Sequence, residues 1–337
     1  MRIRTLSMLR SVLTGLMLTQ IAIVCMAQTG PESDFPIPEL SGFRALPAPE
    51  AALSAELAEL VSATGLDTMT PAARNPDAED EWASIAVVDL TSGEPVVGSW
   101  KGDNLIYPAS LYKMYVLGEV IRQVGEGEVS LDDPVTIAGH NVREEAPLTS
   151  GTTVTVSEIL RLMIQDSSNT AANEAIDLAD RRRVTALLRA LGCGESEITR
   201  KFLPRGKEDP GWADAPGTTS CANHLATFLW AAEQGAISGG AGRGLIKGYL
   251  AMCRTNFDRF RAGLPDSATV YAKTGAWDIF TGEAALVEDG EVKYILCAIV
   301  PQPREEAAPR MARLAEGVHA LMRSRHASEG NSIQGTQ

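Results

Sequence analysis

The segment 107–124 constrains this chain most, because it combines a helical pattern with two polar side chains in apolar surroundings. Pro108 suits the first turn of a helix, where its missing N–H costs nothing. Apolar residues then fall on nearly every side, which predicts a buried helix; they are Leu111, Met114, Val116, Leu117, Val120 and Ile121. Ser110 and Lys113 lie within this pattern at i, i+3 spacing, so both side chains share one face.

A lysine buried beside a serine predicts nucleophilic chemistry. An ammonium group in apolar surroundings is costly unless it is paired or neutral. A desolvated lysine with a lowered pKa can take a proton from a serine hydroxyl. Ser110 would then be the nucleophile and Lys113 its base. Taken alone, the tetrad is better explained by a capping serine and a surface lysine, so other motifs must decide.

The first 27 residues have the pattern of a secretory signal peptide. Three arginines precede the apolar stretch 13–26, and small residues allow cleavage after Ala27. A lipid anchor on Cys25 is the alternative, disfavoured by the bulky Val24 before it. We expect a secreted or periplasmic protein whose mature form has no membrane segment.

Composition narrows the partners of the chain. A net charge of −13 over 337 residues argues against a nucleic-acid partner. The histidines and cysteines lack metal-site spacing, so we expect no metal. We also expect no cofactor, and a monomer. The mature chain keeps four cysteines, whose pairing spacing alone cannot give; they are Cys193, Cys221, Cys253 and Cys297. Cys297 lies in an apolar run and is expected to be a buried thiol.

Hydrophobic periodicity gives the order of the elements. A proline-rich leader at 28–49, expected to be extended and mobile, precedes the domain, and a polar, disordered tail at 325–337 follows it. Helices are expected near 50–63, 107–124, 156–164, 170–190, 222–234 and 304–323. Strands are expected near 82–89, 94–100, 268–275, 282–288 and 292–300, the third running into a turn.

The strands fall at both ends of the chain, and the middle is helical. One sheet must therefore take strands from both ends, flanked by the first and last helices, which predicts an α+β fold with an inserted all-helical lobe. We expect a catalytic domain at 50–324, with an α/β lobe at about 50–105 and 265–324. The helical lobe covers about 106–264.

Three short motifs stand in order: Ser110-x-x-Lys113, Ser167-x-Asn169 and Lys273-Thr274-Gly275. Their order and spacing resemble the class A β-lactamases and penicillin-binding proteins. The resemblance covers about residues 82–323. It implies a serine β-lactamase-like fold with an antiparallel sheet, and acyl-transfer chemistry on Ser110.

The resemblance also implies roles for the second motif. Ser167 would relay a proton to the departing amide nitrogen of the substrate. Asn169 would hydrogen-bond the substrate amide and steady Lys113.

The third motif would bind the rest of the substrate. Lys273 would supply positive charge for the substrate carboxylate and keep Ser167 polarised, and Thr274 would offer that carboxylate a hydroxyl. Gly275 would let the strand approach the cleft closely. The oxyanion hole would be the backbone N–H groups of Ser110 and Ala276.

Two positions depart from the family pattern. Ser168 stands where the second motif usually has aspartate. The family's deacylating glutamate, followed four residues later by asparagine, should fall near 202–204, where no residue is acidic. Glu208 is the nearest candidate, but Trp212 stands four residues after it. A solvated loop charge is the competing interpretation of Glu208.

Three functions remain open at this point. The first is a secreted serine β-lactamase acting on small-molecule β-lactams. The second is a D-alanyl-D-alanine peptidase-like enzyme acting on cell-wall peptides. The third is a non-hydrolytic protein that binds β-lactams or muropeptides, because a chain without the water-activating glutamate should stall as an acyl-enzyme.

Overall fold

The computed structural model of this chain describes residues 35–70, 81–144 and 146–334. The predicted signal peptide and the first part of the leader lie outside these ranges. Residues 35–49 form no helix or strand, as expected, but they pack on the domain. Trp230 Nε1 donates to the Arg44 carbonyl over 2.8 Å, and Leu40, Phe43 and Leu46 contact the core.

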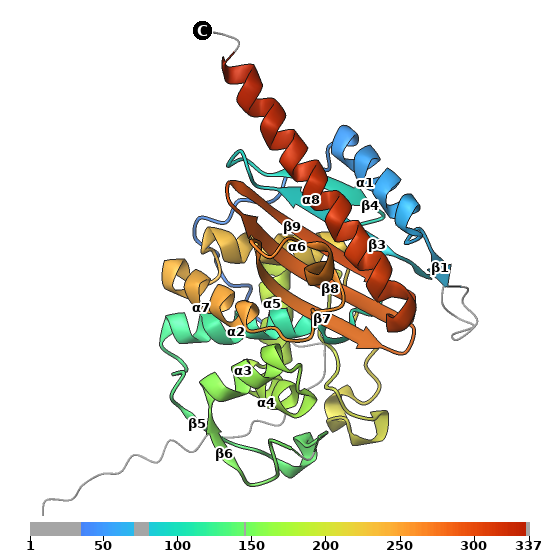
Figure 1. The fold of residues 1–337 in the computed structure, drawn as a ribbon. Coiled ribbons are helices and arrows are strands. Elements are labelled where there is room, and N and C mark those ends of the chain that lie inside the picture. The colour runs from blue at the N-terminus through green and yellow to red at the C-terminus, as the bar shows by residue number, and fades with distance from the viewer. Residues whose placement is uncertain (1–34, 71–80, 145, 335–337) are drawn as a thin grey trace, which may run out of the picture.

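A five-stranded antiparallel sheet lies at the centre of the fold (Figure 1). Its order is β4-β3-β9-β8-β7, so strands from both ends of the chain pair along β3 and β9. The strands are β3 (Ser84–Asp89), β4 (Val96–Trp100), β7 (Thr269–Trp277), β8 (Phe280–Asp289) and β9 (Val292–Val300). The predicted α+β class with an antiparallel sheet is confirmed.

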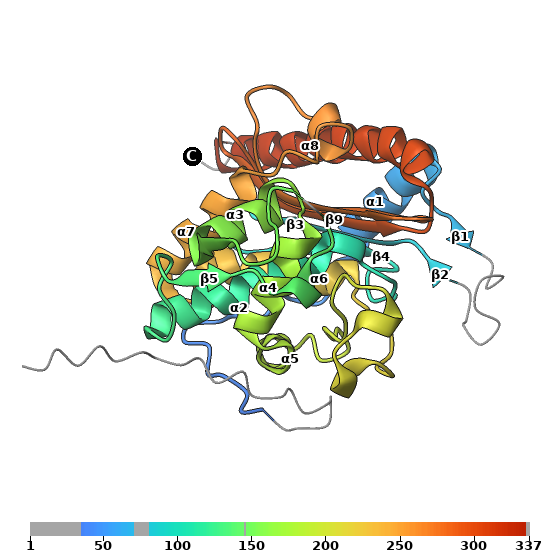
Figure 2. The same ribbon diagram turned by 90° about the horizontal axis from the view of Figure 1, so that it is seen from below.

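Helices cover both faces of the sheet (Figure 2). The first and last helices, α1 (Ala51–Thr64) and α8 (Arg304–Gln334), lie on one face, and α6 (Ala222–Gln234) lies against the other. Along β3, Ile85 and Val87 pack towards α1 and α8, whereas Ala86 and Val88 join the core of the helical side. The strand is therefore apolar at successive positions, as expected for strands buried on both faces.

The central helix of the helical layer is α2 (Lys113–Glu126). It contacts α3 (Val156–Gln165), α4 (Asn169–Ala179), α5 (Arg181–Ala190) and α7 (Gly239–Ala251). Every residue from Lys113 to Gln123 is buried, which confirms the predicted buried helix. The α-helix begins later than expected, because Ala109–Tyr112 form a 3₁₀ turn before it.

The structure corrects four further expectations about the helices and strands. The single helix expected over 170–190 is two, because Asp180 has a φ of +59° and its side chain accepts from the Arg182 N–H. Helix α7 was not predicted, since its five glycines have low helix propensity and packing has to hold it. Strand β7 continues past Gly275, where a turn was expected.

The fourth correction concerns the C-terminus, where the disordered tail expected from residue 325 is wrong through Gln334. Helix α8 continues there, and Arg325 lies 3.4 Å from carboxylate oxygens of Glu56 and Asp89. These contacts with α1 and β3 extend the docking of α8 beyond the predicted helix end.

The smaller features complete the fold. Two short antiparallel pairs lie outside the main sheet: β1 (Met69–Thr70) with β2 (Glu81–Trp82), and β5 (Pro134–Thr136) with β6 (Thr153–Thr155), the latter next to α3 in the helical layer (Figure 1). The four cysteines within the described ranges are unpaired, and Cys297 is buried as expected. None of the helices described is both long enough and apolar enough to cross a membrane.

Candidate active site

Two serines of the motifs sit beside strained backbone. Ala109, directly before Ser110, has a φ of +48°, and Ser167 itself has a φ of +59°. Residues other than glycine rarely adopt a positive φ, and each one that does lowers the stability of the fold by about 1–3 kcal/mol. The fold therefore holds both serines in positions that the chain would not adopt locally.

The Lys113 side chain is completely buried and ends among oxygen atoms of the second motif. Its Nζ lies 2.6 Å from the Ser167 carbonyl, 2.9 Å from Asn169 Oδ1 and 3.3 Å from Ser167 Oγ. Burial lowers the pKa of Lys113 well below its usual value, and the charge of Lys273 lowers it further. A neutral amine at this position can accept a proton.

Lys273 approaches the same serine from the sheet. Its Nζ lies 3.0 Å from Ser167 Oγ and 2.8 Å from the Thr274 carbonyl. Burial lowers the pKa of Lys273 to about 8. Ser167 Oγ therefore bridges two lysine nitrogens that are 160 residues apart in sequence. The structure brings together Lys113, Ser167, Asn169 and Lys273, as the motifs predict.

Gly275 lets β7 lie against the turn that carries Ser110. A Cβ at position 275 would stand 2.6 Å from the Pro108 carbonyl oxygen and 3.1 Å from the Ser110 nitrogen. Both neighbours are backbone atoms, so they cannot move aside without shifting the turn. The predicted close approach of the strand at Gly275 is thus present in the structure.

A second cation, which the sequence did not reveal, lies near Lys273. Arg259 is only 2 % exposed, and its Nη1 donates to the Gly282 carbonyl over 3.0 Å. Its charge contributes to the lowered pKa of Lys273. Beside it, burial raises the pKa of Glu283 to about 8. Arg259 follows a helix and precedes a 3₁₀ turn, so no motif marks it in the sequence.

Glu144 supports the second motif from a neighbouring loop. Its carboxylate accepts the backbone N–H groups of Asn169 over 3.1 Å and Thr170 over 2.8 Å. Burial acts to raise the pKa of Glu144, but the hydrogen bonds from Thr170 and Asn169 lower it overall. Because Ser168 lacks the family's carboxylate, Glu144 supplies one to this turn from outside the motif.

Phe202 occupies the position over Lys113. Its ring centroid lies 4.2 Å from Lys113 Nζ, and the ring stacks on Tyr112 with centroids 4.7 Å apart. The Phe202 N–H donates to Asn173 Oδ1 over 2.8 Å, which fixes the backbone of the loop against α4. An aromatic face, and not a carboxylate, therefore covers the lysine from the loop side.

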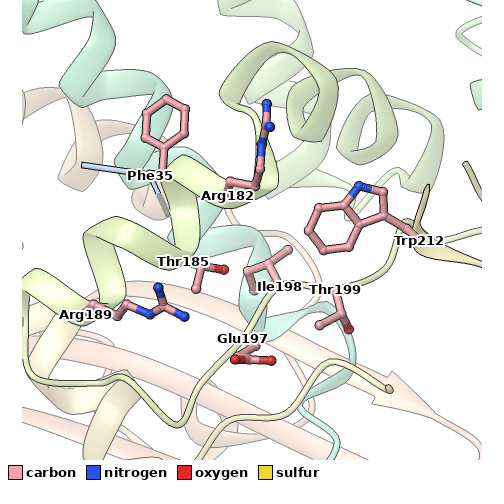
Figure 3. Close-up of a pocket in the computed structure, with 8 residues that line it drawn as sticks. All are labelled: Phe35, Arg182, Thr185, Arg189, Glu197, Ile198, Thr199 and Trp212. Atoms are coloured by element: carbon pink, nitrogen blue, oxygen red, sulfur yellow. The ribbon is translucent and has the colours of Figure 1, made fainter. Parts of the chain in front are cut away.

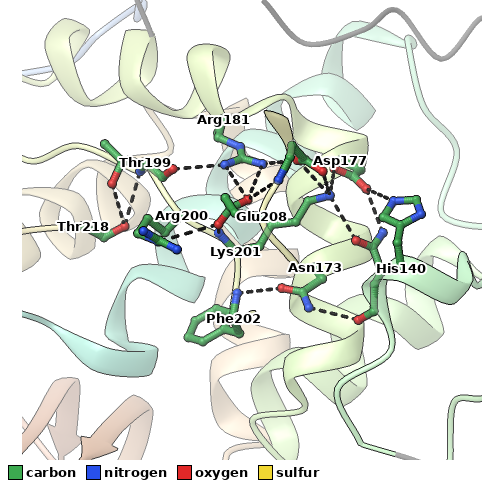
Figure 4. A network of polar contacts seen from close by, with 12 residues as sticks. His140, Asn173, Asp177, Arg181, Thr199, Arg200, Lys201, Phe202, Glu208 and Thr218 are labelled. Carbon is green, nitrogen blue, oxygen red and sulfur yellow. Dashed lines mark hydrogen bonds and ion pairs between the residues drawn. The ribbon is translucent and has the colours of Figure 1, made fainter. Parts of the chain in front are cut away.

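Glu208 belongs to a polar network around Arg181 and Lys201, and no hydrogen bond or ion pair among the described residues joins its side chain to Lys113, Ser167 or Lys273 (Figure 4). Its side chain is fully enclosed and lies 3.2 Å from Arg181 Nη1, while its second oxygen accepts the Lys201 N–H over 3.0 Å. The neighbouring Asp209 also pairs with Arg181. These bonds use the carboxylate of Glu208 to anchor the loop to α5, so they do not support the deacylating role predicted for it.

A groove of about 420 Å³ opens beside the cluster. Its lining includes Asn169 and Phe202 with two rim aromatics, Tyr107 and Trp277, whose rings lie 5.5 Å apart. A separate pocket at α5 encloses only about 30 Å³ and contains none of the predicted site residues (Figure 3). That volume holds one or two water molecules and is too small for a substrate.

The described ranges lack the side-chain arrangements that bind metal ions. No three His, Cys, Asp or Glu side chains there gather in a way that could hold a metal ion.

Comparison with known proteins places this chain in one family. A model of the "Beta-lactamase enzyme family" matches residues 73–321. Beta-lactamase AST-1 of Nocardia asteroides is 28 % identical over 244 residues, which are 71 % of this chain and 77 % of that protein. Beta-lactamase Toho-2 of Escherichia coli is 26 % identical over 246 residues, which are 70 % and 82 % of the two chains.

Solved structures agree with this placement. PBP-A superposes with a TM-score of 0.67 at 23 % identity, covering 83 % of this chain and all of that one. A mutant of the class A beta-lactamase of the last common ancestor of Gram-negative bacteria gives a TM-score of 0.65 at 25 % identity, covering 80 % and 97 %. The chain belongs to the beta-lactamase enzyme family, which confirms the resemblance of its three motifs.

We predict that Gly275→Ala destabilises the protein by about 1–3 kcal/mol, because its methyl group overlaps backbone atoms of the turn at Ser110. Denaturant unfolding followed by circular dichroism measures the change. Gly244→Ala in α7 is the matched control, since a Cβ there meets nothing within 4 Å. We expect that control to be neutral or slightly stabilising; equal effects of the two variants would contradict the close approach.

Proposed function

We propose that this protein is a secreted serine hydrolase of the class A β-lactamase type, which opens the β-lactam amide through an acyl-enzyme on Ser110. The observation that carries the proposal is Ser167 Oγ, held 3.3 Å from Lys113 Nζ and 3.0 Å from Lys273 Nζ. An alcohol between a desolvated amine and a cation is a path for protons, which amide cleavage requires. Membership of the beta-lactamase enzyme family supports the substrate class.

Acylation begins with proton removal from Ser110. Neutral Lys113 takes the hydroxyl proton, directly or through a water molecule, and Ser110 Oγ attacks the carbonyl carbon. The N–H groups of Ser110 and Ala276 stabilise the developing oxyanion. Loss of one such donor typically costs about 10²–10³ in rate.

Cleavage of the C–N bond then uses the second and third motifs. Ser167 gives its proton to the leaving nitrogen and regains one from Lys113. Asn169 binds the amide of the acyl side chain. Lys273 and Thr274 hold the substrate carboxylate, and Arg259 adds a second positive charge behind them.

Deacylation lacks the family's usual base, because Phe202 covers Lys113 where the resemblance calls for glutamate. An acyl-enzyme without a positioned base hydrolyses slowly. This observation favours a second candidate function, a D-alanyl-D-alanine peptidase-like enzyme or a protein that binds β-lactams or muropeptides and keeps the acyl group.

Several further proposals concern the whole chain. We propose a signal peptide at 1–27, export to the periplasm or beyond, and a monomeric catalytic domain at 50–324 without metal or cofactor. The α/β lobe takes about 50–105 and 265–324, and the helical lobe about 106–264. Packing of α1 and α8 on one face of the sheet and of the helical layer on the other supports this division.

The proposed function predicts a covalent adduct on Ser110. Incubation of the purified mature protein with a chromogenic cephalosporin, followed by intact mass and by absorbance, measures adduct formation and turnover separately. We expect stoichiometric adduct with slow turnover. Turnover supports the hydrolase, whereas a lasting adduct without turnover supports the second candidate function. Ser110→Ala should abolish both, and the absence of any adduct on the unchanged protein would end the proposal.

The acylation rate should have a bell-shaped pH profile. It rises as Lys113, whose pKa is lowered well below its usual value, becomes the neutral base. It falls above about pH 8, because Lys273 then loses the proton that attracts the substrate carboxylate. The second-order rate constant of adduct formation, measured from acid to alkaline pH, gives both limbs. Lys273→Arg should keep its charge and extend the alkaline side; a flat profile contradicts these roles.

Restoring the family's carboxylate should accelerate deacylation. In the double variant Phe202→Glu/Gly206→Asn, glutamate replaces the ring over Lys113, and asparagine follows four residues later. A Cβ at Gly206 meets nothing within 4 Å, so the second change fits. We expect decay of the isolated acyl-enzyme to rise by about 10²-fold or more, as a general base contributes. Phe202→Gln/Gly206→Asn is the control; equal decay of both variants would contradict the role of a base here.

A further inference from the structure

The groove beside Asn169 is lined by cations, although the chain carries a net charge of −13. Arg143, Arg200 and Arg205 all line it, and the described lining contains no aspartate or glutamate. Lys201 also lines the groove, but its buried ammonium is paired with acidic residues of the loop and of α4. Three arginines on one concave surface make the electrostatic potential of the groove positive, although the protein as a whole is negatively charged.

These arginines have few acidic partners of their own within the described ranges. Arg143 and Arg205 are exposed, and no described carboxylate lies within 4.0 Å of either guanidinium. Arg200 lies 3.7 Å from Glu208 through Nε, while its Nη1 is shielded from solvent and lacks an acceptor among the described residues. A buried donor without a partner is costly, so a shift of the Arg200 side chain that brings Nη1 to a ligand oxygen in the groove would be favourable.

The position of the groove shows which part of a substrate reaches it. Asn169 joins the groove to the catalytic cluster, because its Oδ1 accepts from Lys113 and its side chain lines the groove. Lys273 and Arg259, which hold the carboxylate beside the scissile amide in the proposed function, do not line it. The groove therefore continues from the amide of the acyl side chain, away from the carboxylate site.

We propose that this enzyme prefers acyl donors whose acyl side chain carries a second carboxylate, bound by Arg143, Arg200 and Arg205. This inference rests on the proposed function, since it assigns the side chain of the same substrate to the groove. Guanidinium groups bind carboxylates through paired N–H donors, so arginine suits this role better than lysine. The groove of about 420 Å³ has room for an aromatic side chain bearing such a group.

Two penicillins that differ by one carboxylate test the preference. Benzylpenicillin and its α-carboxybenzyl counterpart, carbenicillin, are reacted with the full mature protein. Intact mass of quenched samples gives the second-order rate constant of Ser110 adduct formation for each. We expect carbenicillin to react about 5-fold faster or more at low salt, as exposed ion pairs allow. High salt should reduce that ratio, because it screens exposed charges.

Charge variants assign the preference to the groove. Arg143→Gln and Arg205→Gln should each lower the carbenicillin-to-benzylpenicillin ratio, and the double variant should lower it further, leaving only the contribution of Arg200. Arg313→Gln is the matched control, because it removes the same charge from an exposed position of α8 across the sheet. We expect that control to leave the ratio unchanged.

The outcomes separate this inference from the function beneath it. Equal reaction of both penicillins with the unchanged protein, or a ratio unaffected in the double variant, overturns the carboxylate preference and leaves the acyl-enzyme proposal standing. Failure of both penicillins to label Ser110 contradicts the acyl-enzyme proposal. The proposed preference for a second carboxylate would then be contradicted as well.

Discussion

The burial of the Lys113 ammonium group is the constraint on which the site depends. A lysine with no exposed surface, at the start of a helix surrounded by apolar side chains, must share its hydrogens with nearby oxygens or lose its charge. In the structure, oxygen atoms of Ser167 and Asn169 lie 2.6–3.3 Å from Lys113 Nζ. The same burial that makes the lysine costly lowers its pKa, so the packing of one side chain produces both the position of the base and its basicity.

Several strained or unusual features serve to hold this arrangement. The positive φ of Ser167 turns its hydroxyl towards both lysines, and Glu144 fixes the following turn through the N–H groups of Asn169 and Thr170. On the loop side, the pairs between Arg181, Glu208 and Lys201 hold the segment that places Phe202 over Lys113 (Figure 4). In the proposed function, acylation and deacylation thus depend on different sides of the same site. The departure at Ser168 is offset by the carboxylate of Glu144, whereas the departure at Phe202 leaves the loop side without a carboxylate.

The two steps of the proposed reaction therefore rest on different observations. The family match, the sheet order and the three motifs all concern the part of the molecule that is proposed to form the acyl-enzyme. In the proposed function, the fate of the acyl group depends on one loop position, where Phe202 stands instead of the family's glutamate. The groove beyond Asn169, lined by arginines in an acidic protein, adds a preference that neither the fold nor the motifs contain.

The sequence by itself determined the α+β class and the buried helix, because periodicity is a local property of the chain. Its short motifs also contain Lys113, Ser167, Asn169 and Lys273, which the structure brings together. The sequence did not determine the split at Asp180, the glycine-rich helix α7 or the helical end of α8, since packing and single backbone angles decide these. Nor could it find Arg259, Glu144 or Phe202 as neighbours of the site. Their roles arise from contacts between segments distant in sequence, and only the tertiary structure decides which distant side chains meet.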